Sequence, residues 1–124
     1  MEIATGSRGI AFDAVNVGTG QLLTYDGTLT LTMTSAVADV PYNLFSFSSK
    51  TGNFSSIDFS GFYAGGTFSR SGDLWTSTLT QGQIFTFDQS SGNLIASAVP
   101  EPATWALLAF SLTTVMVLRR RKTY

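Results

Sequence analysis

The clearest hydrophobic pattern in the chain is a strict alternation over residues 28–34. Leu29, Leu31 and Met33 are apolar, and every position between and beside them is threonine. A period of two residues places the apolar set on one face of a β-strand and the threonines on the other. The spacing therefore predicts a half-buried strand. Upstream, residues 22–25 predict another strand, and Asp26-Gly27 between the two predicts a hairpin turn.

The middle of the chain predicts two more strands of the same kind. In residues 42–48, Phe45 and Phe47 are expected on one side of a strand and Tyr42 and Leu44 on the other. Residues 54–59 predict the next strand, with Ile57 and Phe59 facing the same way. The segment 50–53 between them contains Gly and Asn, which predicts a turn.

Three turn signals then recur ten residues apart: Ser71-Gly72-Asp73, Gln81-Gly82-Gln83 and Ser91-Gly92-Asn93. Short β-rich segments separate them, and nothing before Pro100 shows a helical period. We therefore predict an all-β domain at residues 1–98, built as an antiparallel meander. A sandwich and a β-solenoid-like end both remain open.

The end of the chain has a different character. Residues 103–118 carry no charge, and a helix counted from Pro102 has 17 residues, about 25 Å at roughly 1.5 Å per residue. That is close to the lower length limit for crossing a bilayer, and Trp105 suits the interface at one end. Four cations, Arg119, Arg120, Arg121 and Lys122, follow the run. The positive-inside rule then predicts a cytoplasmic C-terminus, with residues 1–99 on the far side of the membrane.

The apolar run is preceded by Pro100, Glu101 and Pro102. A Pro-Glu-Pro motif, a hydrophobic helix and a terminal basic cluster, in that order, resemble the PEP-CTERM sorting signal of Gram-negative bacteria. The resemblance covers residues 99–122. It implies an exosortase as partner, cleavage near the motif, and a setting of exopolysaccharide production. It also implies an inner-membrane precursor with residues 1–99 in the periplasm, which later reaches the cell surface or the extracellular space.

The first residues lack the pattern that such an exported protein needs. Residues 1–8 show no basic segment followed by an apolar one, so they are not a secretory signal peptide. We expect the chain to be truncated at its N-terminus. The alternative is that the C-terminal helix directs insertion by itself.

Composition excludes several functions. Before Pro100 there are seven acidic and three basic residues, a net charge of −4, which argues against nucleic acid as a partner. The chain has no cysteine and no histidine, so it lacks a thiol nucleophile, the commonest metal ligand and the usual general base. We therefore predict no enzyme activity, no cofactor and no metal. The six aspartates lack calcium-loop spacing and are expected to cap turns.

The aromatic residues offer the remaining lead for a binding function. Trp75 and Tyr63 are candidates for a surface platform that stacks on sugars, and the alternative is that both fill the core. Three functions thus stay open. One is an exosortase-processed surface or matrix protein with a structural or adhesive role. The others are a carbohydrate-binding module on a membrane anchor and an uncleaved single-pass membrane protein.

Overall fold

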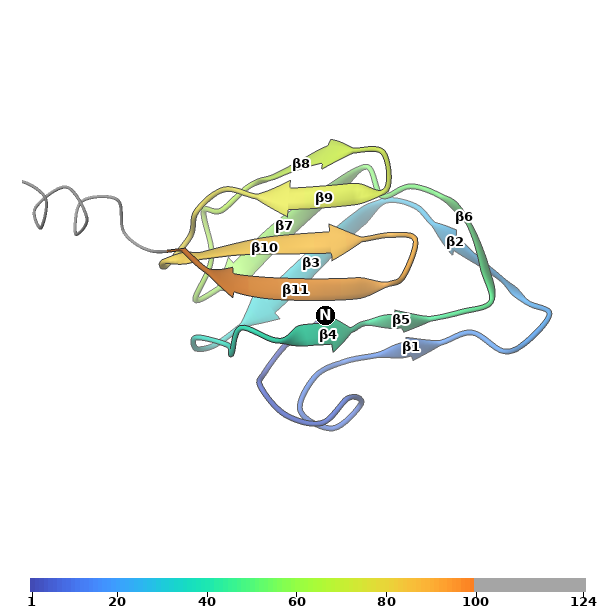
Figure 1. Ribbon diagram of the computed structural model, residues 1–124, viewed down its shortest axis with the longest axis horizontal. Helices are drawn as coiled ribbons and strands as arrows, with labels where there is room; N and C mark the ends of the chain where they lie inside the picture. Colours follow the sequence, from blue (N-terminus) through green and yellow to red (C-terminus); the bar gives the residue numbers. More distant parts are fainter. Residues whose placement is uncertain (100–124) are drawn as a thin grey trace, which may run out of the picture.

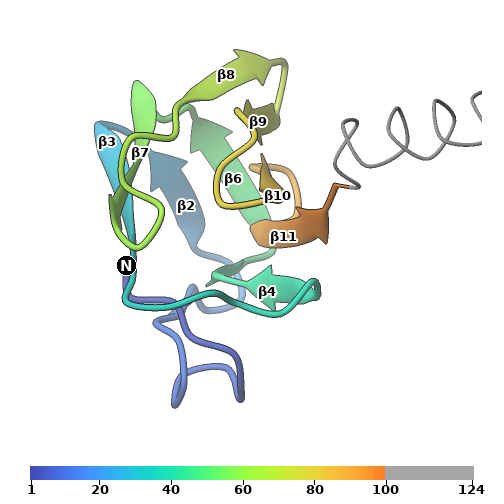
Figure 2. The same ribbon diagram turned by 90° about the vertical axis from the view of Figure 1, so that its left-hand side faces the viewer.

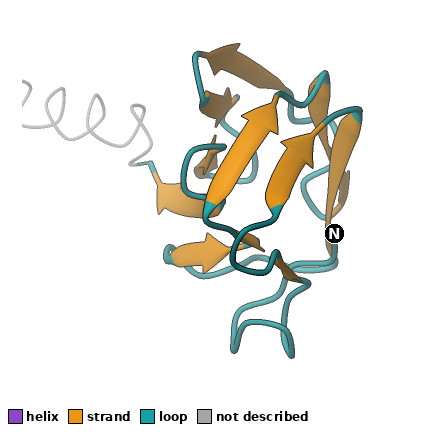
Figure 3. Ribbon diagram, turned by 90° about the vertical axis from the view of Figure 1, so that its right-hand side faces the viewer, coloured by secondary structure: helices purple, strands orange, loops and turns teal. Residues whose placement is uncertain are grey.

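The structure is a computed structural model that describes residues 1–99, and these residues contain strands and loops but no helix (Figures 1 and 3). The all-β prediction is therefore confirmed for this part of the chain. The strands, in chain order, are β1 (Val15–Asn16), β2 (Leu22–Tyr25), β3 (Thr28–Met33), β4 (Pro41–Asn43), β5 (Phe45–Ser46), β6 (Ser49–Gly52), β7 (Ser56–Gly61), β8 (Phe68–Ser71), β9 (Leu74–Ser77), β10 (Gln83–Asp88) and β11 (Asn93–Ala98).

The first strands form two turns of a parallel coil, here called the coil (residues 15–61). β1 pairs with β5, β2 with β6 and β3 with β7, each pair parallel and each in its own two-stranded sheet. Residues 15–33 make the first turn and residues 45–61 lie alongside as the second. Figure 2 shows β2 next to β6 and β3 next to β7. This arrangement is the solenoid-like end that the sequence left open.

Matching side-chain patterns explain why the two turns stack. In the β3–β7 ladder, Leu29 lies beside Ile57 and Leu31 beside Phe59, and all four side chains are buried. The outward positions of the same ladder are polar, so burial fixes the register. Gly61 ends β7 with a φ of 81°, and a Cβ there would lie 2.3 Å from the Met33 carbonyl oxygen. Only glycine fits this close approach between successive turns.

Two local predictions fail in the coil. Asp26-Gly27 does not close a hairpin, because β2 and β3 each pair with the second turn of the coil instead of with one another. Gly27 has a φ of 66° and forms a corner between two faces. The segment 50–53 was predicted as a turn, but Ser49–Gly52 is strand β6, paired with β2. Turn propensity describes a local bend and does not specify which strands pair across it.

The later strands form the predicted meander (residues 68–98). β8, β9, β10 and β11 are antiparallel neighbours, and β4 completes a five-stranded sheet in the order β4-β11-β10-β9-β8. The chain turns near each predicted Gly-containing site. The antiparallel pairing is therefore confirmed here, whereas it is wrong for the coil.

The core lies between the coil and the meander. In Figure 2, β3 and β7 face the strands β9 to β11, with β2 and β6 connecting the two sides. One aromatic cluster joins Tyr25, Phe45 and Phe54 of the coil to Phe87 of the meander, with ring centroids 5.0–6.2 Å apart. Burying a side chain of this size contributes roughly 1.5–3 kcal/mol, so the shared aromatics make the two regions one folding unit.

The alternation of buried and exposed side chains is interrupted between β4, which belongs to the five-stranded sheet, and β5, which belongs to the coil. The sequence predicted one strand over 42–48 with Leu44 and Phe45 on opposite faces, but both are buried. The chain instead divides into β4 and β5, and the N–H groups of Leu44 and Phe45 both donate to the Gly92 carbonyl, at 2.9 and 3.2 Å. The irregular segment thus turns two consecutive apolar side chains toward the core.

Candidate functional site

The boundary between the β domain and the C-terminal segment lies at the end of β11. This strand runs inside the five-stranded sheet, between β10 and β4. Its last residue, Ala98, is paired with Gln83, and the next N–H, that of Val99, donates to the Gly82 carbonyl at 3.1 Å. The backbone is thus held in the fold up to Val99.

The predicted sorting residues follow directly and lie outside the described residues. These are the motif residues Pro100, Glu101 and Pro102, the helix predicted over 103–118, and the basic cluster 119–122. Within residues 1–99, no helix has the length and apolarity needed to cross a membrane.

Trp75 and Tyr63, the two candidates for sugar stacking, both lie in the core. Trp75 is 5% exposed and Tyr63 is 0% exposed. The Tyr63 ring packs edge-on against Phe85, with centroids 4.8 Å apart. The geometry therefore supports the alternative in which both rings fill the core, and neither is presented on the surface for a glycan.

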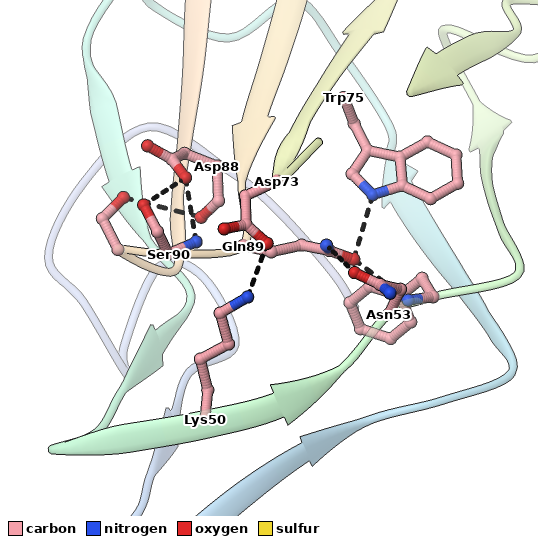
Figure 4. A network of polar contacts seen from close by, with 9 residues as sticks. Lys50, Asn53, Asp73, Trp75, Asp88, Gln89 and Ser90 are labelled. Carbon is pink, nitrogen blue, oxygen red and sulfur yellow. Dashed lines mark hydrogen bonds and ion pairs between the residues drawn. The ribbon is translucent and has the colours of Figure 1, made fainter. Parts of the chain in front are cut away.

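A fully buried glutamine explains the position of Trp75 (Figure 4). Gln89 follows β10, and its Oε1 accepts hydrogen bonds from the Trp75 indole N–H and the Phe54 backbone N–H, both at 3.0 Å. Its Nε2 donates to Asn53 Oδ1 at 2.9 Å. Because the donors come from β9 and from the loop after β6, one side chain ties the meander to the coil.

A second buried glutamine, Gln83, lies at the other end of β10 and also ties the meander to other segments of the chain. Gln83 Nε2 donates to the Val37 carbonyl and to Asp39 Oδ1, both at 2.8 Å. Its Oε1 accepts from the Tyr63 hydroxyl, which in turn accepts from the Val37 N–H at 3.1 Å. Burial is the main cause that raises the pKa of Tyr63 above its ordinary value. All these polar groups are paired, as most buried polar groups are.

The two aspartates near Gln89, Asp73 and Asp88, act as an ion-pair partner and as a turn cap. Asp88 Oδ1 accepts from the backbone N–H and the hydroxyl of Ser90, at 2.8 and 2.6 Å, which closes the β10–β11 turn. Asp73 is paired with Lys50 of the coil, and the hydrogen bond from that ammonium lowers the pKa of the Asp73 carboxyl. Figure 4 shows the two carboxylates engaged with different partners, Asp73 with Lys50 and Asp88 with Ser90.

Carboxylate side chains do not cluster elsewhere in residues 1–99. No group of three or more Asp or Glu side chains gathers there in a way that could hold a metal ion. A shallow hollow of about 140 Å³ lies beside the first residues of the chain and is lined by Glu2, Ile3, Ala4, Ala11, Thr32 and Thr34. It brings together no set of groups with evident chemistry.

Sequence reasoning missed the two buried glutamines. Gln83 was assigned to a turn and Gln89 was not singled out, because glutamine is mostly a surface residue. The only sequence signal is their placement at the two ends of the Ile84–Asp88 strand pattern. Such a placement puts both side chains at the edges of the core.

Comparison with known proteins locates a function in the C-terminal segment. The family model of the PEP-CTERM protein-sorting motif matches residues 98–122, about a fifth of the chain. The chain is thus consistent with a PEP-CTERM sorting domain-containing protein, as the sequence resemblance predicted. The motif indicates exosortase-dependent sorting to the cell surface, with a membrane-associated stage. Neither curated proteins nor solved structures gave a significant match to this chain.

Proposed function

We propose that this protein is an exported, non-enzymatic surface or matrix component, made as a membrane-anchored precursor and released by an exosortase. The match to the sorting motif, which begins where the last strand of a folded β domain ends, carries this proposal. Residues 1–98 are the cargo and residues 99–122 the signal.

In the precursor, residues 103–118 span the inner membrane as a helix. The 17 residues from Pro102 to Leu118 carry no charge and are near the minimum for a span, and Arg119 to Lys122 extend it by reaching the headgroups. The same four cations hold the C-terminus in the cytoplasm, which leaves residues 1–98 in the periplasm. An exosortase then cuts near Pro100-Glu101-Pro102.

After release, the β domain acts structurally or adhesively in the extracellular polysaccharide. The distribution of side chains between its core and its surface supports this role. Most of its aromatic side chains are buried, and many of its exposed strand positions are serine or threonine, whose hydroxyl groups suit contact with a hydrated polymer. Its net charge of −4 before Pro100 favours neutral or amine-bearing polymers over acidic ones.

The chain offers a matched pair of substitutions for testing the proposal, because Glu101 and Glu2 are its only glutamates. In cells that contain the exosortase, Glu101→Ala should leave precursor in the membrane fraction. Glu2→Ala, at an exposed position far from the motif, should be processed like the wild type. Equal processing of both variants would refute recognition through the motif. A wild-type chain that is never cut would identify an uncleaved membrane protein instead.

A further inference from the structure

We propose that the corner at Asp26-Gly27, between β2 and β3, is a site of spontaneous aspartate isomerisation, in which the main chain is rerouted through the Asp26 side chain. The product is isoaspartate, and the only co-reactant is water. The reaction needs neither an exosortase nor a membrane, so it stands or falls independently of the function proposed above.

Glycine directly follows Asp26, and the five other aspartates of the chain lack this neighbour. A glycine has no side chain that would hinder attack of its own nitrogen on the preceding carboxyl carbon. The space around Gly27 is open as well. Within residues 1–99, and apart from the chain neighbours, no heavy atom lies within 4 Å of the position that a Cβ would take. The other aspartates are followed by residues with side chains: Ala14, Val40, Phe59, Leu74 and Gln89.

The folded chain also brings the two reacting groups together. The Gly27 N–H donates to Asp26 Oδ1 at 2.8 Å, so the nitrogen lies beside the carboxyl group that it attacks. By contrast, the N–H of Gln89, which follows Asp88, donates to the Asp73 carbonyl at 2.9 Å. Both residues of the corner are exposed, which admits water. Holding a nucleophile next to its target in this way favours an intramolecular reaction.

The reaction has two balanced steps. First, the Gly27 nitrogen bonds to the carboxyl carbon of Asp26, and the carboxyl O–H leaves with the amide hydrogen as water, which closes a five-membered cyclic imide. Second, water adds to one of the two imide carbonyl carbons. Addition at the former side-chain carbon restores aspartate. Addition at the main-chain carbon breaks its bond to the Gly27 nitrogen and leaves isoaspartate, with a free carboxylate on Cα.

Isomerisation at this corner should disturb the coil, because the chain is fixed on both sides of it. β2 is held by β6 and β3 by β7, each in a parallel ladder. Between these ladders, the Gly27 carbonyl accepts a hydrogen bond from the Ser55 N–H at 2.7 Å. Isoaspartate adds one main-chain carbon between the end of β2 at Tyr25 and the start of β3 at Thr28. The added atom therefore displaces the Gly27 carbonyl and loosens the first turn of the coil against the second.

The reaction is measured on the full chain in detergent micelles, which is kept at neutral pH and digested at intervals. Electron-transfer mass spectrometry distinguishes isoaspartate from aspartate, because the two residues break at different main-chain bonds. We expect isoaspartate to form roughly tenfold faster, or more, at Asp26 than at the other five aspartates, which serve as internal controls. Equal rates at Asp26 and at the other aspartates would overturn the proposal.

Two substitutions test the cyclic route. Asp26→Asn keeps an acceptor for the Gly27 N–H and expels ammonia, which leaves more readily than water does from a carboxyl group, so isoaspartate should form faster than in the wild type. Asp26→Glu has to close a six-membered ring, which forms more slowly, so no isomerised product should accumulate in the same time. Isomerisation of Asp26→Glu at the wild-type rate, or of Asp26→Asn no faster than the wild type, would contradict attack by the Gly27 nitrogen.

The effect on the fold is measured by urea unfolding of the same incubated samples. An earlier unfolding transition should appear in the wild type and grow with the fraction of isoaspartate at position 26. Asp26→Glu, incubated in the same way, should keep its initial midpoint. If conversion leaves the wild-type midpoint unchanged, the corner does not fix the two ladders, and the proposed effect on the coil is wrong.

Discussion

The coil and the meander are built from similar residues, yet their strands find partners in different ways. In the meander, each strand pairs with the next one along the chain, and Asp88 pairs with Asn93 across a short turn. In the coil, Thr28 pairs with Ser56, and the chain runs through two other faces before it returns. Local turn chemistry is therefore enough to specify the meander, whereas the coil depends on matching patterns far apart in sequence.

The two regions nevertheless share one core, and this suggests that they unfold together. Aromatic residues of the coil pack on β10, and buried glutamines at both ends of β10 bond to segments outside the meander. The following predictions test this dependence, from the largest effect to the smallest.

The largest effect is expected for Phe87→Ala. Phe87 is fully buried on β10 and contacts the aromatic rings of Tyr25, Phe45 and Phe54. Its removal should cost about 3–5 kcal/mol of unfolding free energy. Urea unfolding followed by tryptophan fluorescence and by circular dichroism should still show one transition. If the two signals separate, the coil and the meander are independent units. Phe62→Ala, at a half-exposed ring, serves as the control and should cost far less.

Gly92→Ala should cost about 3 kcal/mol, because it adds backbone strain and overpacking at the point where the meander meets β5. Gly92 has a φ of 74°, and an added Cβ would lie 2.1 Å from the Phe45 carbonyl oxygen. Gly72 is the matched control, since its φ is 61° but no atom lies within 4 Å of the added group. Gly72→Ala should therefore cost only the backbone strain, about 1–2 kcal/mol. Equal losses in thermal unfolding would argue against a tight contact at Gly92.

Removing either of two buried tyrosine hydroxyls should have different effects on the free energy of unfolding. Tyr63→Phe leaves the Val37 N–H and the Gln83 Oε1 without their partner and should cost about 1–3 kcal/mol. The Tyr25 hydroxyl of the coil has no hydrogen-bond partner within residues 1–99, so Tyr25→Phe should be neutral or stabilising. Chemical denaturation of the two variants measures both effects, and a large loss for Tyr25→Phe would reveal an unrecognised partner.

The Tyr25 hydroxyl also makes the fold sensitive to alkali. Burial, with smaller contributions from Asp88 and Asp73, raises the pKa of Tyr25 above the ordinary value of 10.0. A raised pKa in the folded state gives stability that is complete below pH 10 and is lost as the pH rises beyond it, because the unfolded chain ionises first. Tyr25→Phe should therefore move alkaline unfolding to higher pH. An unchanged midpoint would count against the burial of this hydroxyl.

The smallest effect is expected for the ion pair between the coil and the β8–β9 turn. Lys50 lowers the pKa of Asp73, so the pair contributes stability above the ordinary aspartate pKa of 3.8 and loses it as the pH falls through the lowered value. Because Asp73 is exposed, Lys50→Met should reduce stability at pH 7 only slightly, and the difference should vanish near pH 2. A difference that persists in acid would show that the loss does not come from the ion pair.

Particular residues show how far the sequence could predict this structure. The strand at Thr28–Met33 was predicted because its alternation is a local pattern, and the meander turns were predicted for the same reason. The hairpin predicted at Asp26-Gly27 was wrong, because the strands on either side pair with segments about 28 residues further along the chain. The glutamines Gln83 and Gln89 were missed since burial of a polar side chain depends on partners brought from distant segments. The sorting signal was found because it is a linear motif that is recognised without a fold.

The proposed function requires that a sorting enzyme releases a folded β domain from a membrane-anchored precursor. The most direct measurement is cell fractionation with an antibody against residues 1–98, in otherwise identical cells with and without the exosortase. We expect a shortened, membrane-free domain when the enzyme is present and full-length chain in the membrane fraction when it is absent. Full-length chain that is free of the membrane in both strains would contradict the claim.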